Sequence, residues 1–176
     1  MNWIRLKQFE KSGTLVSVTI RESDGDASYT GYVQHVDPNF IVLGMVSEWH
    51  HDGLSIFRIP SVVSCDGSKL LDEQSRIVDW NCGKPDDVPD WPVFENDEAL
   101  FRSLSLQPLY VFLYDGDAAE VGRISSVSSG GLVMSGVDAG GNILAEPITW
   151  TFDEIVQVTF GDEYSSTLYR YVYRQP

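Results

Sequence analysis

The sequence predicts a mainly β protein made of two small barrels in tandem, each with about five short antiparallel strands preceded by a short helix. Three observations support this prediction: the chain aligns with itself, each half contains runs of alternating apolar residues, and Asp-Gly pairs interrupt those runs. We expect the first barrel at residues 1–80, a linker at 81–95 and the second barrel at 96–176.

The internal repeat is found by sliding the chain against itself by 91 positions. Val18–Val46 then lies on Leu109–Val137 without a gap, and 8 of 29 positions are identical. The identical residues are Asp24–Ala27 with Asp115–Ala118, Gly31 with Gly122, and Val36, Val42 and Val46 with Val127, Val133 and Val137. A two-residue insertion then shifts the offset to 93. Such self-similarity indicates one structural unit written twice.

Each copy begins with a helical pattern. In the second copy Asn96 or Asp97 caps the helix, and Leu100, Phe101 and Leu104 share one face. Strands with period-two alternation follow. They are expected at about residues 16–20, 30–36, 40–46, 54–59 and 62–65, and again at 109–113, 121–127, 132–137, 143–150 and 155–160. Asp-Gly pairs mark the first hairpin turns, and polar, glycine-rich tips are expected at residues 50–53 and 138–142.

The segment between the copies has a different composition. It contains three prolines and three aspartates between Cys82 and Pro92, which is typical of an extended linker. Trp80 and Trp91 either anchor this linker to a barrel surface or leave it simply solvated.

The plan of helix, strand, Asp-Gly turn and a glycine that opens the second strand resembles that of the Sm and Sm-like proteins. The stretch from Gly31 to Asp37, followed by residues 39–43, resembles the first Sm motif, and Ile59–Val63 resembles the closing strands of the bacterial Hfq branch. This resemblance implies an SH3/Sm-like barrel fold and an RNA-binding loop at Asp37 and Asn39. The second copy has Ser128 and Gly130 at the places of that loop, and the Lys-His pair of Hfq would fall on Ile56 and Phe57.

The charge of the chain is strongly acidic, with a net charge of −14. Residues 1–95 hold 15 acidic and 8 basic side chains, and residues 96–176 hold 11 and 4. A field of this sign repels phosphate backbones, so nucleic acid is not the expected partner. It suits a basic protein partner, or it serves solubility alone. The start of the chain lacks a signal-peptide pattern and no apolar run is long enough to span a bilayer, so we expect a cytoplasmic protein without membrane contact.

Few residues carry chemistry. His50, His51 and Asp52 are weak candidates for a metal site, because zinc needs three or four convergent ligands and adjacent residues tend to diverge. No nucleophile elbow, phosphate loop or His-Glu-x-x-His motif occurs, so we expect no enzyme activity and no cofactor. Cys65 and Cys82 are expected to be reduced thiols.

The carboxy-terminal residues are rich in tyrosine. Tyr169, Tyr171 and Tyr173 are candidate binding residues, since tyrosine is enriched at interfaces. The alternative is that they belong to a last strand or helix that covers the second barrel.

These observations lead to two functional hypotheses. The first is a non-enzymatic protein-interaction module, in its sharpest form an acidic immunity or inhibitor protein that neutralises a basic partner. The alternative is a divergent Sm-like RNA-binding protein that uses Asp37 and Asn39. We expect a monomer or at most a dimer, with the two barrels in contact, because a ring of several −14 chains accumulates like charge.

Overall fold

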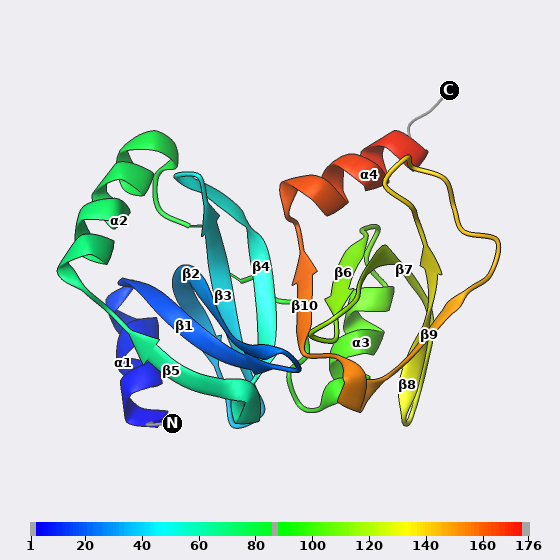
Figure 1. Cartoon of the computed structure of the whole chain (residues 1–176), viewed down its shortest axis with the longest axis horizontal. Coiled ribbons are helices and arrows are strands. Elements are labelled where there is room, and N and C mark those ends of the chain that lie inside the picture. Colours follow the sequence, from blue (N-terminus) through cyan, green and yellow to red (C-terminus); the bar gives the residue numbers. More distant parts are fainter. Residues whose placement is uncertain (1–2, 86–87, 174–176) are drawn as a thin grey trace. The chain divides into compact units, whose positions relative to one another are not determined.

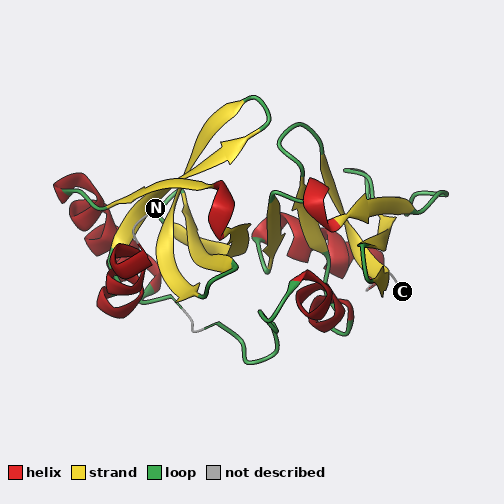
Figure 2. Cartoon of the chain, turned by 90° about the horizontal axis from the view of Figure 1, so that it is seen from below, coloured by secondary structure: helices red, strands yellow, loops and turns green. Residues whose placement is uncertain are grey.

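The structure, a computed structural model, describes residues 3–85 and 88–173 and divides into two compact units, Met1–Val88 and Pro89–Pro176 (Figure 1). The division falls inside the segment at 81–95 where a linker was expected. The prediction of a mainly β protein is confirmed: the described residues form ten antiparallel strands and four α-helices. In each unit the strands form a curved sheet with helices against it (Figure 2).

The first unit consists of a helix, five strands and a second helix. Its elements are α1 (Trp3–Ser12), β1 (Leu15–Glu22), β2 (Gly25–Val36), β3 (Phe40–Ser47), β4 (His50–Arg58), the 3₁₀ helix η1 (Ile59–Ser61), β5 (Val62–Asp66) and α2 (Lys69–Cys82). The strands lie in the order β5-β1-β2-β3-β4, and each hydrogen-bonded pair among them is antiparallel.

The second unit has the same sequence of elements. They are α3 (Asp97–Ser105), β6 (Val111–Tyr114), β7 (Ala119–Ser128), β8 (Gly131–Gly136), β9 (Ile148–Thr151), the 3₁₀ helix η2 (Phe152–Glu154), β10 (Gln157–Phe160) and α4 (Glu163–Tyr173). Its strand order, β10-β6-β7-β8-β9, is that of the first unit position by position. The two units therefore repeat one topology.

A glycine marks the place where the second strand of each unit passes from one neighbour to the other. Gly31 pairs with Val16 of β1 and with Met45 of β3. A Cβ atom at Gly31 would lie 2.6 Å from the carbonyl oxygen of Gly44, closer than real Cβ atoms approach. The strand can cross between its two neighbours here because this residue has no side chain.

Gly122 has the same role in β7. It pairs with Val111 and Gly136, and a Cβ atom there would lie 2.2 Å from the carbonyl oxygen of Ser135. Gly31 and Gly122 therefore correspond as predicted: each pairs with both neighbouring strands, and each lies against a carbonyl oxygen of the third strand.

The pairing of the second and third strands repeats residue by residue. Each pair between β2 and β3 has its counterpart 91 positions later between β7 and β8, and both ladders shift register at the same place, between Val33 and His35 and between Ile124 and Ser126. In the fourth strand the offset is 93, as expected after the insertion. Ile41 pairs with Phe57 and Leu132 pairs with Trp150, so the third-strand residues differ by 91 positions and the fourth-strand residues by 93. The alignment is confirmed in these strands.

In the first strand the gap-free alignment is wrong. It placed Ile20 on Val111. In the structure, Val16 pairs with Gly31 and Val111 pairs with Gly122, the two glycines that we call the switch glycines. The offset there is 95, because the β1–β2 hairpin of the first unit is longer. Both Asp-Gly turns still lie in equivalent hairpins, with Gly25 at φ 139° and Gly116 at φ 101°.

The first helices form as expected. Asn96 caps α3, since its side chain accepts a hydrogen bond from the amide of Ala99 at 2.9 Å. Leu100, Phe101 and Leu104 are buried on one face of α3, and Leu6 of α1 is buried as well.

The last helices were not resolved by the sequence: α2 was not predicted, and α4 was left open as a strand or a helix. Both helices pack on the same part of their sheet. Leu71 and Val78 of α2 join Leu15 and Tyr32 in one core cluster. In the second unit, Leu168 of α4 joins a cluster whose other members are Tyr110, Val121 and Val137.

Two strand predictions need correction. Residues 50–53, expected as a polar tip, begin β4, because the chain turns earlier at Glu48 and Trp49. Residues 143–147 were expected in a strand, but β9 begins only at Ile148 and an isolated bridge joins Ile143 to Val137.

Substitution of the switch glycine should destabilise the second unit. We expect Gly122→Ala to lower the free energy of unfolding by about 2–3 kcal/mol, because backbone atoms of β8 would have to move. Gly130→Ala is the matched control, since a Cβ atom there meets nothing within 4 Å, and it should change stability by less than about 0.5 kcal/mol. Urea denaturation followed by tryptophan fluorescence measures both. Equal midpoints for the two variants would show that the close approach is not a constraint.

Candidate functional site

The turn between β3 and β4 has an unusual backbone. Ser47 pairs with His50, so Glu48 and Trp49 form a two-residue turn, with φ of 46° and 70°. A hairpin turn with both central residues in the left-handed region normally contains Asn-Gly. Each residue with a side chain there costs about 1–2 kcal/mol. A Glu-Trp pair is held in this conformation by contacts elsewhere in the unit.

Those contacts come from the end of α2. The side-chain amide of Asn81 donates to the carbonyl oxygen of Trp49 at 3.1 Å. His51 Nε2 lies 2.9 Å from the carbonyl oxygen of Gly83, so Nε2 carries the hydrogen and donates it. The ring of His51 also packs on Tyr32, with ring centres 5.9 Å apart. The turn and the helix end therefore form one rigid corner.

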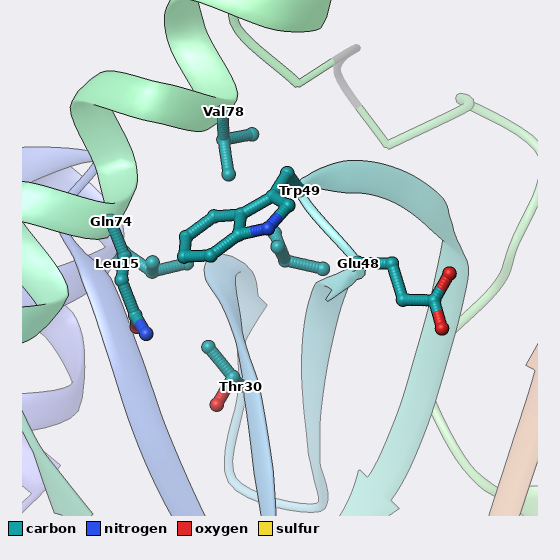
Figure 3. Close-up of a pocket in the computed structure, with 7 residues that line it drawn as sticks. Leu15, Thr30, Glu48, Trp49, Gln74 and Val78 are labelled. Atoms are coloured by element: carbon teal, nitrogen blue, oxygen red, sulfur yellow. The ribbon is translucent and has the colours of Figure 1, made fainter.

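A pocket of about 280 Å³ lies beneath this corner. We call it the Trp49 pocket; its lining residues are Leu15, Thr30, Val46, Glu48, Trp49, Gln74 and Val78. Figure 3 shows the indole of Trp49 between Val78 of α2 and Thr30 of β2. Gln74 lies at one end of the indole, and the carboxylate of Glu48 points outward at the other end. Trp49 is 44% exposed although it lines the pocket.

The outer side of α2 carries three exposed apolar side chains among its charged residues. Leu70, Ile77 and Trp80 are 63%, 45% and 86% exposed, and their spacing places them on neighbouring positions of the helix surface. We call these three residues the α2 face. Trp80, for which both an anchoring and a solvated linker were considered, is almost fully exposed. The α2 face and Asn81 of the rigid corner belong to the same helix.

The tyrosines of α4 pack within their own unit. Tyr169 and Tyr173 lie against Tyr110, with ring centres 5.3 Å and 5.9 Å from it, and burial raises the pKa of Tyr110 to about 12. The ring of Tyr171 covers Gly141, since two of its carbons lie 2.6 Å from the place of a Cβ atom there. Tyr171 and Tyr173 remain about half exposed. Much of this ring surface attaches α4 to the sheet.

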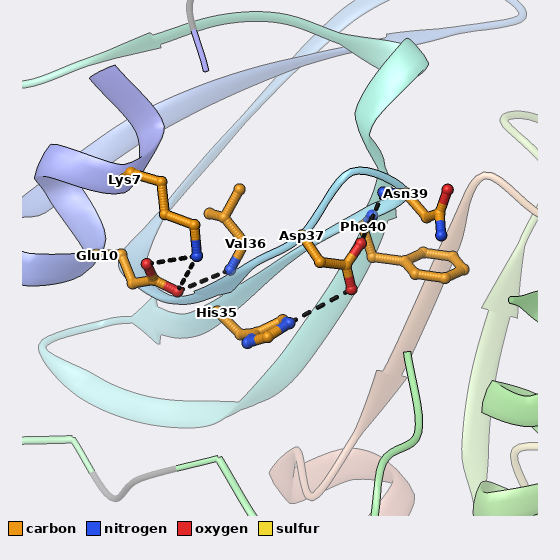
Figure 4. Close-up of polar contacts among 7 residues, drawn as sticks. All are labelled: Lys7, Glu10, His35, Val36, Asp37, Asn39 and Phe40. Atoms are coloured by element: carbon orange, nitrogen blue, oxygen red, sulfur yellow. Dashed lines mark hydrogen bonds and ion pairs between the residues drawn. The ribbon is translucent and has the colours of Figure 1, made fainter. Parts of the chain in front are cut away.

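The carboxylate of Asp37 closes the turn between β2 and β3 (Figure 4). Its Oδ1 accepts hydrogen bonds from the amides of Asn39 at 2.6 Å and Phe40 at 2.9 Å. Its Oδ2 lies 3.3 Å from His35 Nε2. Both oxygens of Asp37 therefore hold the loop in shape. Asn39 is exposed at the tip.

Glu10 of α1 ties the strand beside this loop to the helix. Its carboxylate accepts a hydrogen bond from the amide of Val36 at 3.0 Å and pairs with Lys7 at 2.8 Å. In the second unit the corresponding loop is closed by Ser128, whose hydroxyl donates to the carbonyl oxygen of Gly131.

The histidines proposed as weak metal ligands have separate partners. His50 Nδ1 lies 2.8 Å from the carbonyl oxygen of Glu48, whereas His51 reaches Gly83. Within residues 3–85 and 88–173, no group of three His, Cys, Asp or Glu side chains is placed to hold a metal ion.

Internal ion pairs engage many of the basic side chains. The pairs are Arg5 with Asp66, Lys7 with Glu10, Lys69 with Glu73, Lys84 with Asp79, Arg102 with Glu98 and Arg170 with Glu163. Some carboxylates are held ionised by the backbone: amides of Ala118 and Asp117 lower the pKa of Asp115, and the amide of Thr151 lowers that of Glu154. The surface therefore presents mainly negative charge.

Searches of protein-family models, of curated proteins and of solved structures found no match to this chain. Among the described residues, no helix is long and apolar enough to cross a membrane.

The strain of the Glu48-Trp49 turn is measurable. We expect Glu48→Asn to raise the free energy of unfolding by roughly 1 kcal/mol, because Asn adopts the left-handed conformation more readily and Glu48 is exposed. Glu48→Gln removes the same charge but keeps the strain, so its stability should stay at the wild-type value. Thermal unfolding of the two variants separates strain from charge. An equal gain in both would assign the effect to charge.

The two thiols should react differently. Burial raises the pKa of Cys65 to about 12, whereas Cys82 is exposed at the end of α2. We expect Ellman's reagent to modify one thiol in the native protein and the second only after denaturation. The Cys82→Ser variant should show no fast reaction. Two fast thiols in the wild type would contradict the burial of Cys65.

Proposed function

We propose that this chain is a non-enzymatic interaction module that binds a basic protein through its first unit. The observation that carries the proposal is the α2 face. A tryptophan that is 86% exposed beside two further exposed aliphatic side chains is an unusual surface for a protein that acts alone. Buried tryptophans at the centre of an interface commonly contribute most of its affinity.

The charge of the chain favours a basic partner. The net charge is −14, and in the part of the chain that the structure describes at least six of the twelve Lys and Arg side chains lie in the internal ion pairs described above. A basic protein would be attracted to this surface, and an acidic one or a nucleic acid would be repelled. Apolar side chains would then supply the contact area, and the field would speed the encounter.

We further propose that each unit is an Sm-like small barrel, used here as a scaffold. Three features support this: the strand order 5-1-2-3-4 within each unit, a helix before the first strand, and a 3₁₀ turn that joins the fourth strand to the fifth. A fold of this kind does not determine activity. The engagement of Asp37 in its own loop and the negative charge favour a protein partner over RNA.

The sharpest form of this function is that of an inhibitor or immunity protein, which neutralises a basic enzyme or toxin by covering its working surface. Such a protein needs an exposed anchor and complementary charge, and no catalytic group of its own.

The test begins with the tagged chain as bait in an extract of its native cell. The captured protein is then purified, and its affinity for the chain is measured calorimetrically at low and high salt. We expect a basic protein whose affinity falls as salt rises. Capture of RNA, or a salt-independent acidic partner, would overturn the proposal.

The α2 face supplies the variant for this test. Trp80→Ala should weaken the affinity by about thirtyfold, corresponding to the roughly 2 kcal/mol typical of a central tryptophan. Leu106→Ala is the matched control, because Leu106 is 79% exposed but lies after α3 in the second unit, and it should leave the affinity within about twofold. Equal losses for both variants would rule out the α2 face as the docking surface.

A further inference from the structure

We propose that the Trp49 pocket receives one lysine or arginine side chain of the basic partner, an assignment that rests on the function proposed above. Gln74 and Val78 of α2 line the pocket, and Asn81 near the end of the same helix holds the turn that carries Trp49. The pocket and the α2 face therefore lie on one helix, within the reach of a single protein partner.

The size and walls of the pocket suit a single long side chain. Pockets for small-molecule ligands usually measure about 300–1,000 Å³, and this one measures about 280 Å³. Leu15, Val46 and Val78 form its apolar walls. The aliphatic stems of lysine and arginine pack on such walls while their charged ends stay at the surface.

The mouth of the pocket suits a positive charge. The face of a tryptophan is the best aromatic partner for a cation, and Trp49, which lines the pocket, is 44% exposed. The outward carboxylate of Glu48 would accept hydrogen bonds from an ammonium or guanidinium group. Of the basic side chains near this corner, Lys84 is already paired with Asp79.

The pocket is formed before any partner arrives. Asn81 and His51 hold the turn that carries Trp49, and this turn keeps two residues in the left-handed region. A rigid anchor loses little freedom on binding, which favours affinity. An Asn-Gly pair would relieve the strain of this turn. The strained turn thus has a use, because it places both Glu48 and Trp49 in the lining of the pocket.

The probe for the test is a short arginine-rich peptide, compared with the same peptide in which citrulline replaces arginine. Citrulline has nearly the same shape but no charge, so the comparison isolates the cation. We expect the indole N–H signal of Trp49 to move on titration and to saturate, with the citrulline peptide binding at least about tenfold more weakly. The signal of the buried Trp150 should not move and serves as an internal control.

Two variants locate the site. Trp49→Gly deletes the indole while keeping a residue that tolerates this turn, and Glu48→Gln removes the carboxylate alone. Each should weaken binding of the arginine peptide, whereas Leu106→Ala should not. The bound peptide should also slow alkylation of Cys82 by N-ethylmaleimide, because Cys82 Sγ lies 3.8 Å from the carbonyl oxygen of Trp49. If Trp49→Gly fails to fold, the indole N–H signal of Trp49 in the wild-type protein, titrated with the arginine and the citrulline peptide, still tests whether the pocket binds a cation.

The outcomes separate this assignment from the proposed function. If both peptides bind equally, or if the captured basic protein binds Trp49→Gly as tightly as wild type, the pocket assignment is wrong and the interaction module stands. If the pocket takes the arginine peptide but no basic protein is captured, the cation site stands and the proposed function falls.

Discussion

The structure depends on one close approach of backbones within each unit. At Gly31 and at Gly122 the second strand leaves its first neighbour and joins its third-strand neighbour, and a neighbouring carbonyl oxygen lies where a Cβ atom would be. A register shift follows three residues later in both units. Glycine and bulge together let one long strand bend and serve two partners. The curvature of the sheet against which α2 and α4 pack (Figure 2) follows from this bend.

The sequence predicted the second and third strands of each unit well, because their glycine and their apolar residues recur at the same positions when the two halves of the chain are aligned. It misplaced the first strand by four residues. The side-chain period of a strand is two, so a shift of four keeps every residue on its face of the sheet. The alternation of residues 16–20 and 109–113 therefore could not reveal the longer hairpin.

Helix α2 was missed because Leu70, Ile77 and Trp80 blur its amphipathic pattern. The cap at Ser68 and the glycine at Gly83 were the signals that would have found it.

The candidate site could not be read from the sequence for a physical reason. Turn prediction relies on Gly, Asn and Pro, and the Glu48-Trp49 turn has none of them. It was therefore placed at residues 50–53, where Asp52-Gly53 offers the usual signal. The turn exists because the end of α2, more than thirty residues later, holds it through Asn81 and His51. A conformation that depends on tertiary contacts leaves no local signal.

The last helix occupies the same position in the two units, but its side chains pack differently in each. In the second unit, Tyr169, Tyr171 and Tyr173 of α4 turn ring surface toward Tyr110 and Gly141, so the helix closes its own unit. In the first unit, α2 anchors itself with Leu71 and Val78 and leaves Leu70, Ile77 and Trp80 outside. The same topology thus supplies one helix whose tyrosines pack partly on its own unit and one helix that leaves three apolar side chains exposed. Because the strained turn and its pocket lie against α2, the proposed recognition surface is placed on the first unit.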